Sequence, residues 1–485
     1  MSESENTFAS EPGKRPWMIV LGCFATIGVL ATLISCTVLL VYLVTIITKP
    51  AAPTEITLFI GLGTGSDDSQ LEAEHAVVDD FNQSQHNIHV TLEIFKYADA
   101  AKILKSRIEE GKGPDLVGPS GFMQFNSFHG QWLDLTPYIS PADTAPYNPA
   151  LVKMYKTDEG QVALPFAIYP SAVYYNKALF DAAGLNYPPA SYGNQYEMPD
   201  GSSVAWSWDT VAKVARLLTL DNHGLNATQS GFDRQNIVQY GYSWNFETHP
   251  SYIGSYFGNG SMLTNDGRHA QIPDSWHAAW QWTYDGIWGD QPFIPNNAVS
   301  NGHPYDGNPF NSGKVGMIVQ PSWYICCISN VKSWDVAVLP SYQGKVGGRI
   351  DGDSFLIWKG TKHPKETYTF LLYVLNQGAR KLLYSSESGE NPPYGGMSAR
   401  TDQQRPWLNS KQREFPQVKN MTLFFDGINY PDLPPAESYM PGYTDSWKRG
   451  FDFFIPLSVK SDFNLAVEEQ KYIDDLNKIF DDAGN

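Results

Sequence analysis

Between residues 56 and 117, apolar and polar positions alternate between the spacing typical of strands and the spacing typical of helices. A compact apolar run at 56–60 and an alternating run at 88–94 predict two strands. Apolar residues spaced three or four apart predict helices over about 69–82 and 99–110, and a short buried strand follows at 115–117. Strands that alternate with helices in this way predict right-handed crossovers and a mainly parallel sheet.

Later segments fit the same α/β fold class. Ser207 stands where it can cap a helix whose first turn contains Asp209. Loops rich in Gly and Pro separate the later elements, notably at 186–203 and 431–443. The other expected elements are strands over 315–319, 334–339 and 354–358 and helices over 365–375 and 463–480.

The N-terminal end has a different pattern. Residues 17–47 contain no charged side chain, and a helix of that length exceeds the roughly 30 Å hydrocarbon core of a bilayer. Lys14 and Arg15 precede this segment, so the positive-inside bias places the N-terminus in the cytoplasm. We therefore expect a cytoplasmic tail at 1–16, a single-pass transmembrane anchor at 17–47, a short stiff tether at 48–54 and a large domain outside the cell at 55–485.

Cys36 ends a short sequence, Leu33-Ile34-Ser35-Cys36, that resembles a bacterial lipobox, in which the cysteine is lipidated after cleavage. A lipobox normally precedes a polar tether, whereas here the apolar run continues to Val44. The apolar region of a secretory signal is also usually only about 7–15 residues long. The uncleaved anchor is therefore the favoured interpretation, and either outcome holds the domain at the outer face of the cell membrane.

Composition narrows the range of functions. The 485 residues are too many for a single hydrophobic core, so two packed units are expected. The chain has 34 basic and 51 acidic residues, a net charge of −17, which argues against a nucleic-acid partner. Aromatic residues make up 14% of the chain. Trp and Tyr bind amphipathic ligands such as sugars, although they also fill large cores.

The sequence lacks the usual catalytic and metal-binding motifs. The loop Gly61-Leu62-Gly63-Thr64-Gly65-Ser66 has Ser where a dinucleotide fingerprint has its third Gly. There is no HExxH, Walker or GxSxG motif, and the ten His are not grouped at metal-ligand spacing. We expect no cofactor, no metal and no catalytic residue.

Two pairs of residues leave alternatives open. Asp351 and Asp353 have the residue type of the paired carboxylates of a glycosidase, although residues two apart in a loop diverge easily. Cys326 and Cys327 are adjacent in the sequence. Buried free thiols are the favoured interpretation of this pair, and a strained disulfide between neighbours is the alternative.

Several segments occur in an order and spacing that match a known family. The clearest is the run Val173-Tyr174-Tyr175-Asn176-Lys177-Ala178-Leu179-Phe180-Asp181-Ala182-Ala183-Gly184-Leu185. The others are Gly113-Pro114-Asp115-Leu116, Leu133-Asp134-Leu135-Thr136-Pro137-Tyr138-Ile139, Ala163-Leu164-Pro165-Phe166, Trp206-Ser207-Trp208-Asp209, Phe310-Asn311-Ser312-Gly313-Lys314-Val315-Gly316-Met317 and the stretch from Gly347-Gly348 to Trp358. Over nearly all of 55–485 the chain resembles the extracellular solute-binding proteins, family 1, of sugar-importing ABC transporters, the group of the maltose-binding protein.

The resemblance implies a two-lobe α/β fold with a hinge, as in periplasmic binding proteins. Lobe I would comprise about 55–165 and 345–395, and lobe II about 166–344 and 396–485. The monomeric outer domain would bind a small molecule, a sugar or oligosaccharide, in the interlobe cleft and deliver it unchanged to ABC permease subunits in the membrane. A membrane-anchored carbohydrate-active enzyme and a ligand-sensing module without transport stay open as alternatives.

The same resemblance points to ligand-binding residues in four regions. Each aromatic candidate has packing in the core as its alternative. The expected residues are Gly63, Ser66 and Asp67 after the first strand, Pro119 and Ser120 after the third, Trp323 in Gln320-Pro321-Ser322-Trp323, and Asp351, Gly352 and Asp353 in a glycine-rich loop, with Tyr169, Trp244, Trp282 and Glu387 as further candidates.

Overall fold

The computed structural model describes residues 34–38, 52–384 and 392–484. The chain divides into two units, Met1–Pro53 and Thr54–Asn485. In the first unit the described residues, 34–38, are helical. None of the helices in the described part of the chain is long and apolar enough to cross a membrane. Apart from 34–38, the anchor expected at 17–47 lies outside the described residues.

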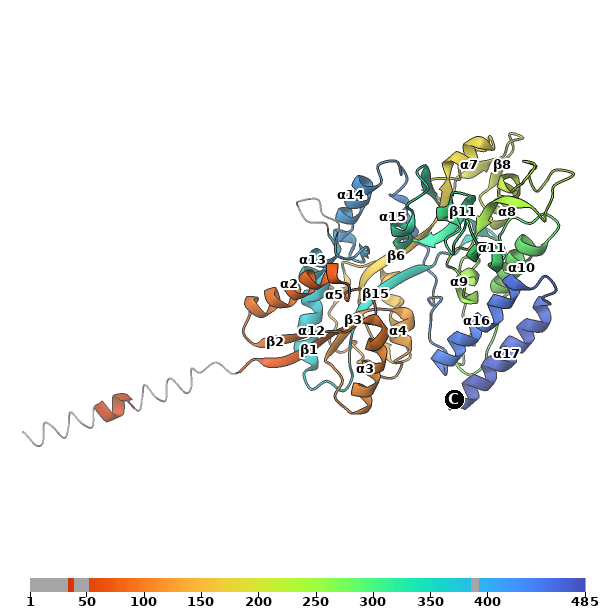
Figure 1. The fold of residues 1–485 in the computed structure, drawn as a ribbon. Helices are drawn as coiled ribbons and strands as arrows, with labels where there is room; N and C mark the ends of the chain where they lie inside the picture. Colours follow the sequence, from red (N-terminus) through yellow and green to blue (C-terminus); the bar gives the residue numbers. More distant parts are fainter. Residues whose placement is uncertain (1–33, 39–51, 385–391, 485) are drawn as a thin grey trace, which may run out of the picture. The chain divides into compact units, whose positions relative to one another are not determined.

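The second unit begins with the strand and helix alternation that the sequence predicts (Figure 1). Strand β1 pairs in parallel with both β2 and β3, as expected for strands joined by crossover helices. The boundaries differ from the expected ones by a few residues at most, except that β3 extends to Gly121. These elements are β1 (Thr54–Ile60), α2 (Asp68–Ser84), β2 (Ile88–Ile94), α3 (Tyr97–Glu109) and β3 (Leu116–Gly121).

Strand β6 (Pro165–Asn176) connects two groups of strands, and every one of its residues is buried. Its first half pairs with β15 (Ile350–Ile357), with Pro170 opposite Ile350. Its second half pairs with β11 (Val315–Pro321) and β12 (Trp334–Ala337), with Ser171 opposite Pro321. We call the part built on β1, β2, β3 and β15 the first lobe and the part built on β10 (Ile237–Ser243), β11 and β12 the second lobe. The sheet therefore passes from one lobe to the other within β6.

The prediction of a mainly parallel sheet is wrong for the centre of the molecule. Strand β6 is antiparallel to β11, β12, β15 and β16 (Met397–Ser398), and β15 is antiparallel to β3. Parallel pairing returns in the second lobe, where β10 (Ile237–Ser243) lies beside β11. Apolar periodicity marks a buried strand but carries no information about the direction of its neighbours, which the long connections decide.

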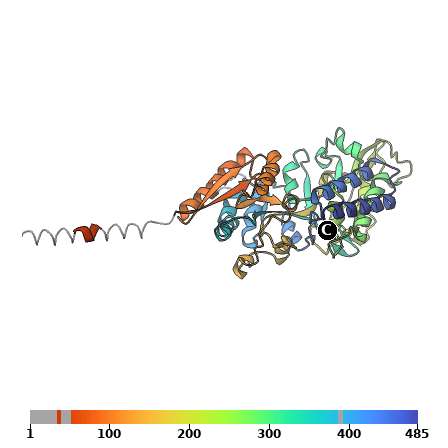
Figure 2. The same cartoon turned by 90° about the horizontal axis from the view of Figure 1, so that it is seen from below.

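Helices cover the second lobe. The predicted helix start at Ser207 is confirmed, because its side chain accepts a hydrogen bond of 3.3 Å from the Thr210 amide at the start of α8 (Trp208–Leu218). Helices α10 (Asp274–Trp288) and α16 (Tyr443–Val459) were not expected from the sequence. Helix α16 contains Pro456 and lies beside α17 (Leu465–Asp482) in both views (Figures 1 and 2).

The remaining elements are short, except for two helices of ten residues, α12 and α14. In the first lobe and around β6 they are α4 (Phe122–Asn126), α5 (Pro141–Thr144), α6 (Pro149–Lys153), β4 (Lys156–Thr157), β5 (Gly160–Gln161), α12 (Pro364–Tyr373), the π-helix η3 (Val374–Gly378), α13 (Ala379–Leu383), η4 (Thr401–Gln403), α14 (Arg405–Glu414) and α15 (Leu423–Gly427). The others are α7 (Lys177–Ala182), β7 (Gln195–Glu197), β8 (Ser203–Ala205), β9 (Leu220–Asp221), α9 (Pro250–Ser255), α11 (Asn297–Asn301), η1 (Phe310–Ser312), η2 (Ser322–Cys327), β13 (Ser341–Tyr342) and β14 (Lys345–Val346).

An aromatic cluster forms the core of the second lobe. Trp208 stacks on Phe257 with ring centroids 4.7 Å apart and meets Trp244 at 5.4 Å and Trp282 at 5.2 Å. The indole of Trp244 donates to the Thr283 hydroxyl at 2.9 Å, and that of Trp282 donates to the Trp208 carbonyl at 3.1 Å. Much of the aromatic content of the sequence is therefore used for packing.

Glu74 of α2 is a buried carboxylic acid in the first lobe, only 1% exposed. It lies against Gly65 in the loop after β1, where an added Cβ would be 2.8 Å from Glu74 Oε1 and 2.5 Å from the Tyr394 hydroxyl. Burial raises the pKa of Glu74 from 4.5 to about 8. The carboxyl is therefore protonated in the folded protein at neutral pH, whereas it is ionised in the unfolded chain.

We predict that Glu74→Gln stabilises the fold at neutral pH. Because the folded-state pKa is raised, the stability linked to Glu74 is complete below about pH 4.5 and is lost as the pH rises through about 8. The amide has no such loss, so the variant should gain about 3 kcal/mol over the parent at pH 7 and little near pH 4.5. Urea unfolding at several pH values measures this difference. Glu72→Gln, an exposed carboxylate on the same helix, is the control, and parallel pH profiles for Glu74→Gln and its parent would contradict the prediction.

Candidate functional site

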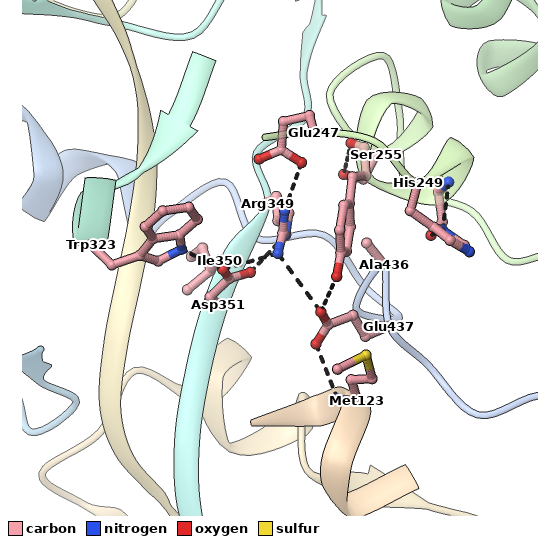
Figure 3. A network of polar contacts seen from close by, with 12 residues as sticks. Met123, Glu247, His249, Ser255, Trp323, Arg349, Ile350, Asp351, Ala436 and Glu437 are labelled. Carbon is pink, nitrogen blue, oxygen red and sulfur yellow. Dashed lines mark hydrogen bonds and ion pairs between the residues drawn. The ribbon is translucent and has the colours of Figure 1, made fainter. Parts of the chain in front are cut away.

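Arg349, the residue before β15, is the centre of a buried polar network (Figure 3). Its side chain is only 7% exposed. Nη1 donates to Glu247 Oε2 at 2.7 Å, and Nη2 donates to Asp351 Oδ2 at 3.0 Å. Glu437 Oε1 lies 3.8 Å from Nη2. One guanidinium thus holds carboxylates from the loop after β10, from β15 and from the loop before α16.

Tyr252 of α9 supports the guanidinium from its face. The Arg349 Cζ atom lies 3.5 Å from the centroid of the Tyr252 ring, a cation–π contact in a buried setting. The Tyr252 hydroxyl donates to Glu437 Oε1. Burial is the main cause that raises the pKa of Tyr252 well above 10, so the hydroxyl keeps the proton that it donates.

Glu437 also links the two lobes. Its Oε2 atom accepts a hydrogen bond of 3.1 Å from the Met123 amide at the start of α4, directly after β3 of the first lobe. Its carbonyl accepts from Asn126 Nδ2 at 2.7 Å. The loop that carries Glu437 leads into α16, whose Tyr443 and Trp447 belong to the core of the second lobe. A single acidic residue therefore contacts both sides of the region where the lobes meet.

Trp323 makes a second contact between the lobes. It lies in the 3₁₀-helix η2, directly after β11, and its indole donates to Asp351 Oδ2 at 2.8 Å. The exposed ring of Phe246 lies nearly parallel to it, with centroids 6.3 Å apart. Trp323 is only partly buried, so this aromatic edge is accessible next to the Asp351 carboxylate.

Asp351, Gly352 and Asp353 lie in strand β15 and not in the glycine-rich loop that the sequence suggested. Residues two apart in a strand share a face, so both carboxylates point to the same side and both are partly exposed there. The Tyr169 hydroxyl donates to Asp353 Oδ2 at 3.1 Å. A Cβ on Gly352 would lie 2.7 Å from the Tyr155 hydroxyl, so a side chain there does not fit between the strand and Tyr155.

Acidic side chains outnumber the one basic side chain, Arg349, among the residues of this site. Burial raises the pKa of Glu247 to about 7, although Arg349 opposes the shift. Burial also raises the pKa of Asp353 to about 6. It raises to about 7 the pKa of Asp432, whose Oδ1 accepts a hydrogen bond of 3.1 Å from the Ile350 amide at the start of β15. The pKa of Glu437 is raised for the same reason. The site therefore offers carboxyl groups that accept hydrogen bonds when ionised and donate one when protonated.

The side chains of the other predicted residues take no part in the contacts of Arg349 given above, although the Trp244 carbonyl accepts a hydrogen bond of 2.9 Å from the Glu247 amide. Gly63 lies close to Pro119, since an added Cβ would be 2.9 Å from the Pro119 carbonyl oxygen. Asp67 is the N-cap of α2, and Ser120 is fully buried in β3, where its hydroxyl donates to the Gly121 carbonyl. Ser66 lies in the loop before α2, Trp244 and Trp282 lie in the aromatic core, and Glu387 lies outside the described residues.

Sequence reasoning missed Arg349, Glu247, Tyr252 and Glu437. Arg349 had a usable signal, because it stands two residues before Asp351 within a stretch that the family resemblance already singled out. Glu247 and Glu437 had none, since they lie 102 residues before and 88 residues after Arg349 in a chain with 51 acidic residues. Over the described ranges, no three His, Cys, Asp or Glu residues are grouped so that they could hold a metal ion.

Solved structures of several bacterial proteins share this fold. M. tuberculosis UspC superposes with a TM-score of 0.67 at 19% identity, over 88% of this chain and 100% of UspC. The cyclic α-maltosyl-1,6-maltose binding protein from Arthrobacter globiformis gives a TM-score of 0.64 at 16% identity, over 89% of this chain and 100% of that protein. The extracellular solute-binding protein from Staphylococcus aureus, solved in complex with maltose, gives 0.59 at 16% identity, over 89% and 98%.

The sequence itself matches a family model. None of the curated proteins matches the chain significantly. The model that describes bacterial extracellular solute-binding proteins matches residues 67–381, which run from the cap of α2 to α13 and include β6, η2 and β15. The match covers well over half of the chain and agrees with the two-lobe fold, so this protein belongs to the bacterial extracellular solute-binding protein family.

Proposed function

We propose that residues 54–485 bind a sugar or oligosaccharide where the two lobes meet and deliver it to an ABC permease. The observation that carries the proposal is the contact between Trp323 of the second lobe and Asp351 of the first, beside the partly exposed Asp353. It places an aromatic ring and two carboxylates at one accessible edge. A sugar presents apolar C–H faces and a rim of hydroxyls, which these two kinds of group recognise.

Selectivity would come from the buried polar groups. A hydroxyl or carboxyl that is desolvated without a partner costs about 1–3 kcal/mol, so a solute with the wrong hydroxyl pattern is rejected. The related proteins support a carbohydrate ligand, since the A. globiformis protein binds a cyclic maltosyl-maltose and the S. aureus protein was solved with maltose. Among the other expected ligand-binding residues, Tyr169 donates a hydrogen bond to Asp353. The loop that contains Gly63 and Ser66 would approach the ligand from the first lobe.

The proposed place of action is the outer face of the cell membrane. The uncharged segment 17–47 would anchor the chain, with 1–16 in the cytoplasm and the tether 48–54 leading to the binding domain. Two lobes would close on the solute, as in other proteins that bind a ligand at a hinge. The first would comprise about 55–165 and 345–395, and the second about 166–344 and 396–485. The domain would act as a monomer, and its permease partner would accept the closed form.

A hydrolytic enzyme is the second candidate, because Asp351 and Asp353 share one face of β15 and the pKa of Asp353 is raised to about 6. The two functions differ in a direct test. A binding protein returns a neutral oligosaccharide such as maltotriose unchanged, whereas a glycosidase produces new reducing ends. A sensing module would also leave the sugar intact but would bind no permease.

We predict that Trp323→Ala weakens sugar binding at least tenfold, a loss of about 1.4 kcal/mol, because the stacking surface and the indole donor to Asp351 are both removed. Isothermal titration with a panel of neutral mono- and oligosaccharides that includes maltose identifies the ligand and measures the change. Trp288→Ala removes another half-buried tryptophan, one that donates to the Leu457 carbonyl, and should leave the affinity unchanged. Equal affinity of Trp323→Ala and the parent would exclude Trp323 from the site.

We also predict that Glu437→Ala destabilises the closed arrangement of the lobes. The variant loses the acceptor for the Met123 amide and the Tyr252 hydroxyl, so the affinity should fall at least fivefold, about 1 kcal/mol. Small-angle scattering should show a smaller sugar-induced contraction than in the parent. Asp452→Ala, an exposed carboxylate on α16, is the matched control. A contraction and affinity equal to those of the parent would show that Glu437 does not contribute to closure.

A further inference from the structure

Cys326 and Cys327 end the 3₁₀-helix η2, the turn that also carries Trp323. Both are free thiols, and their Sγ atoms lie 3.0 Å apart. Cys326 is exposed and Cys327 is half-buried. The expectation of buried thiols is therefore wrong for Cys326, because the turn replaces the strand alternation that would have placed the two side chains on opposite faces.

The two thiols have different reactivity. The hydrogen bond with Cys327 is the main cause that lowers the pKa of Cys326, to about 7, and Lys411 of α14 adds to this shift while burial and Glu414 oppose it. The same hydrogen bond and burial raise the pKa of Cys327. Of the two thiols, the exposed Cys326 thus ionises more readily and is the better-placed nucleophile, and Cys327 keeps its proton to higher pH.

We propose that Cys326 and Cys327 are a reversible redox site that a low-molecular-weight disulfide oxidises to a bond between the two neighbours. The Cys326 thiolate attacks one sulfur of the reagent, forms a mixed disulfide and releases one thiolate. Cys327 then loses its proton and attacks Cys326 Sγ, which releases the second thiolate. Overall, two protein thiols and one disulfide reagent give one protein disulfide and two small thiols, and the reagent is the species that is reduced.

The bond between neighbours is easily reduced again. Adjacent Cα atoms are about 3.8 Å apart, whereas disulfides usually join Cα atoms about 4.4–6.8 Å apart, so the ring is strained. Strained disulfides are more oxidising than relaxed structural ones and exchange with small thiols. The bond also changes the turn that holds Trp323, since the Cys327 carbonyl is fixed at 3.1 Å by Asn308 Nδ2 and the sulfurs must approach by about 1 Å. No step of this thiol–disulfide exchange depends on the proposed binding of a sugar.

The test treats the full-length protein with oxidised glutathione, quenches in acid and alkylates the remaining thiols. Trypsin releases residues 315–332 as one peptide that contains Cys326 and Cys327 and no other cysteine. We expect this peptide to lose the mass of two hydrogen atoms and to resist alkylation. Excess reduced glutathione should then restore both alkylation sites. Two alkylated or two glutathionylated cysteines after oxidation, or a cross-link to the peptide with Cys23 and Cys36, would overturn the proposal.

Two variants test the order of the steps. Cys327→Ser should stop at a glutathione adduct on Cys326, because no resolving thiol follows. Cys326→Ser should react at least tenfold more slowly, because the exposed nucleophile is removed and the remaining Cys327 thiol is half-buried, and burial raises its pKa. Similar rates for the two variants would show that Cys326 is not the preferred nucleophile and would contradict the mechanism. Both variants keep the rest of η2, so their circular dichroism spectra should match that of the parent.

Discussion

The buried guanidinium of Arg349 is the constraint on which the centre of this protein depends. Taking one such charge out of water costs several kcal/mol even after relaxation, and the cost is recovered only if the partners meet it in good geometry. Those partners are Glu247, Asp351 and Glu437, together with the ring of Tyr252. They come from three separate stretches of chain, so the ion pairs hold the ends of β10 and β15 and the loop before α16 at fixed distances from one another.

The contacts where the two lobes meet differ in burial, so some should persist when the lobes move and others should break and form again. The bond between Arg349 and Glu247 has both side chains almost fully buried, and breaking it would leave an unpaired interior charge. Apart from the contacts of Arg349, the bonds that cross between the lobes are only partly buried, namely those from the Met123 amide and Asn126 Nδ2 to Glu437 and from Trp323 to Asp351. Such bonds contribute about 0.5–1.5 kcal/mol each, which suits lobes that close and open again. Strand β6 can stay intact during this motion, because its two halves pair with strands of different lobes.

The fold was predictable from the sequence where the signal is local. The alternation of β1, α2, β2, α3 and β3, and the Ser207 cap, follow from spacing and capping chemistry. Strand directions and helix α16 were not predictable in this way, since pairing is decided by connections and α16 contains Pro456, which normally argues against a helix interior. In the candidate site, the ordered resemblance pointed to Trp323, Asp351 and Asp353. No local pattern marked Glu247 and Glu437, because only the folded chain brings these two acidic residues to Arg349.

The aromatic content is weaker support for a sugar ligand than it first suggests. Trp208, Trp276, Trp280, Trp334 and Trp407 are fully enclosed, and Trp244 and Trp282 pack with Trp208. A large hydrophobic core can use such rings for packing, whatever ligand the protein binds. What distinguishes this protein is that one ring, Trp323, stays partly exposed while its nitrogen is held by a carboxylate of the other lobe. The case for carbohydrate binding therefore depends on the placement of a single side chain between the lobes, and the number of tryptophans adds little to it.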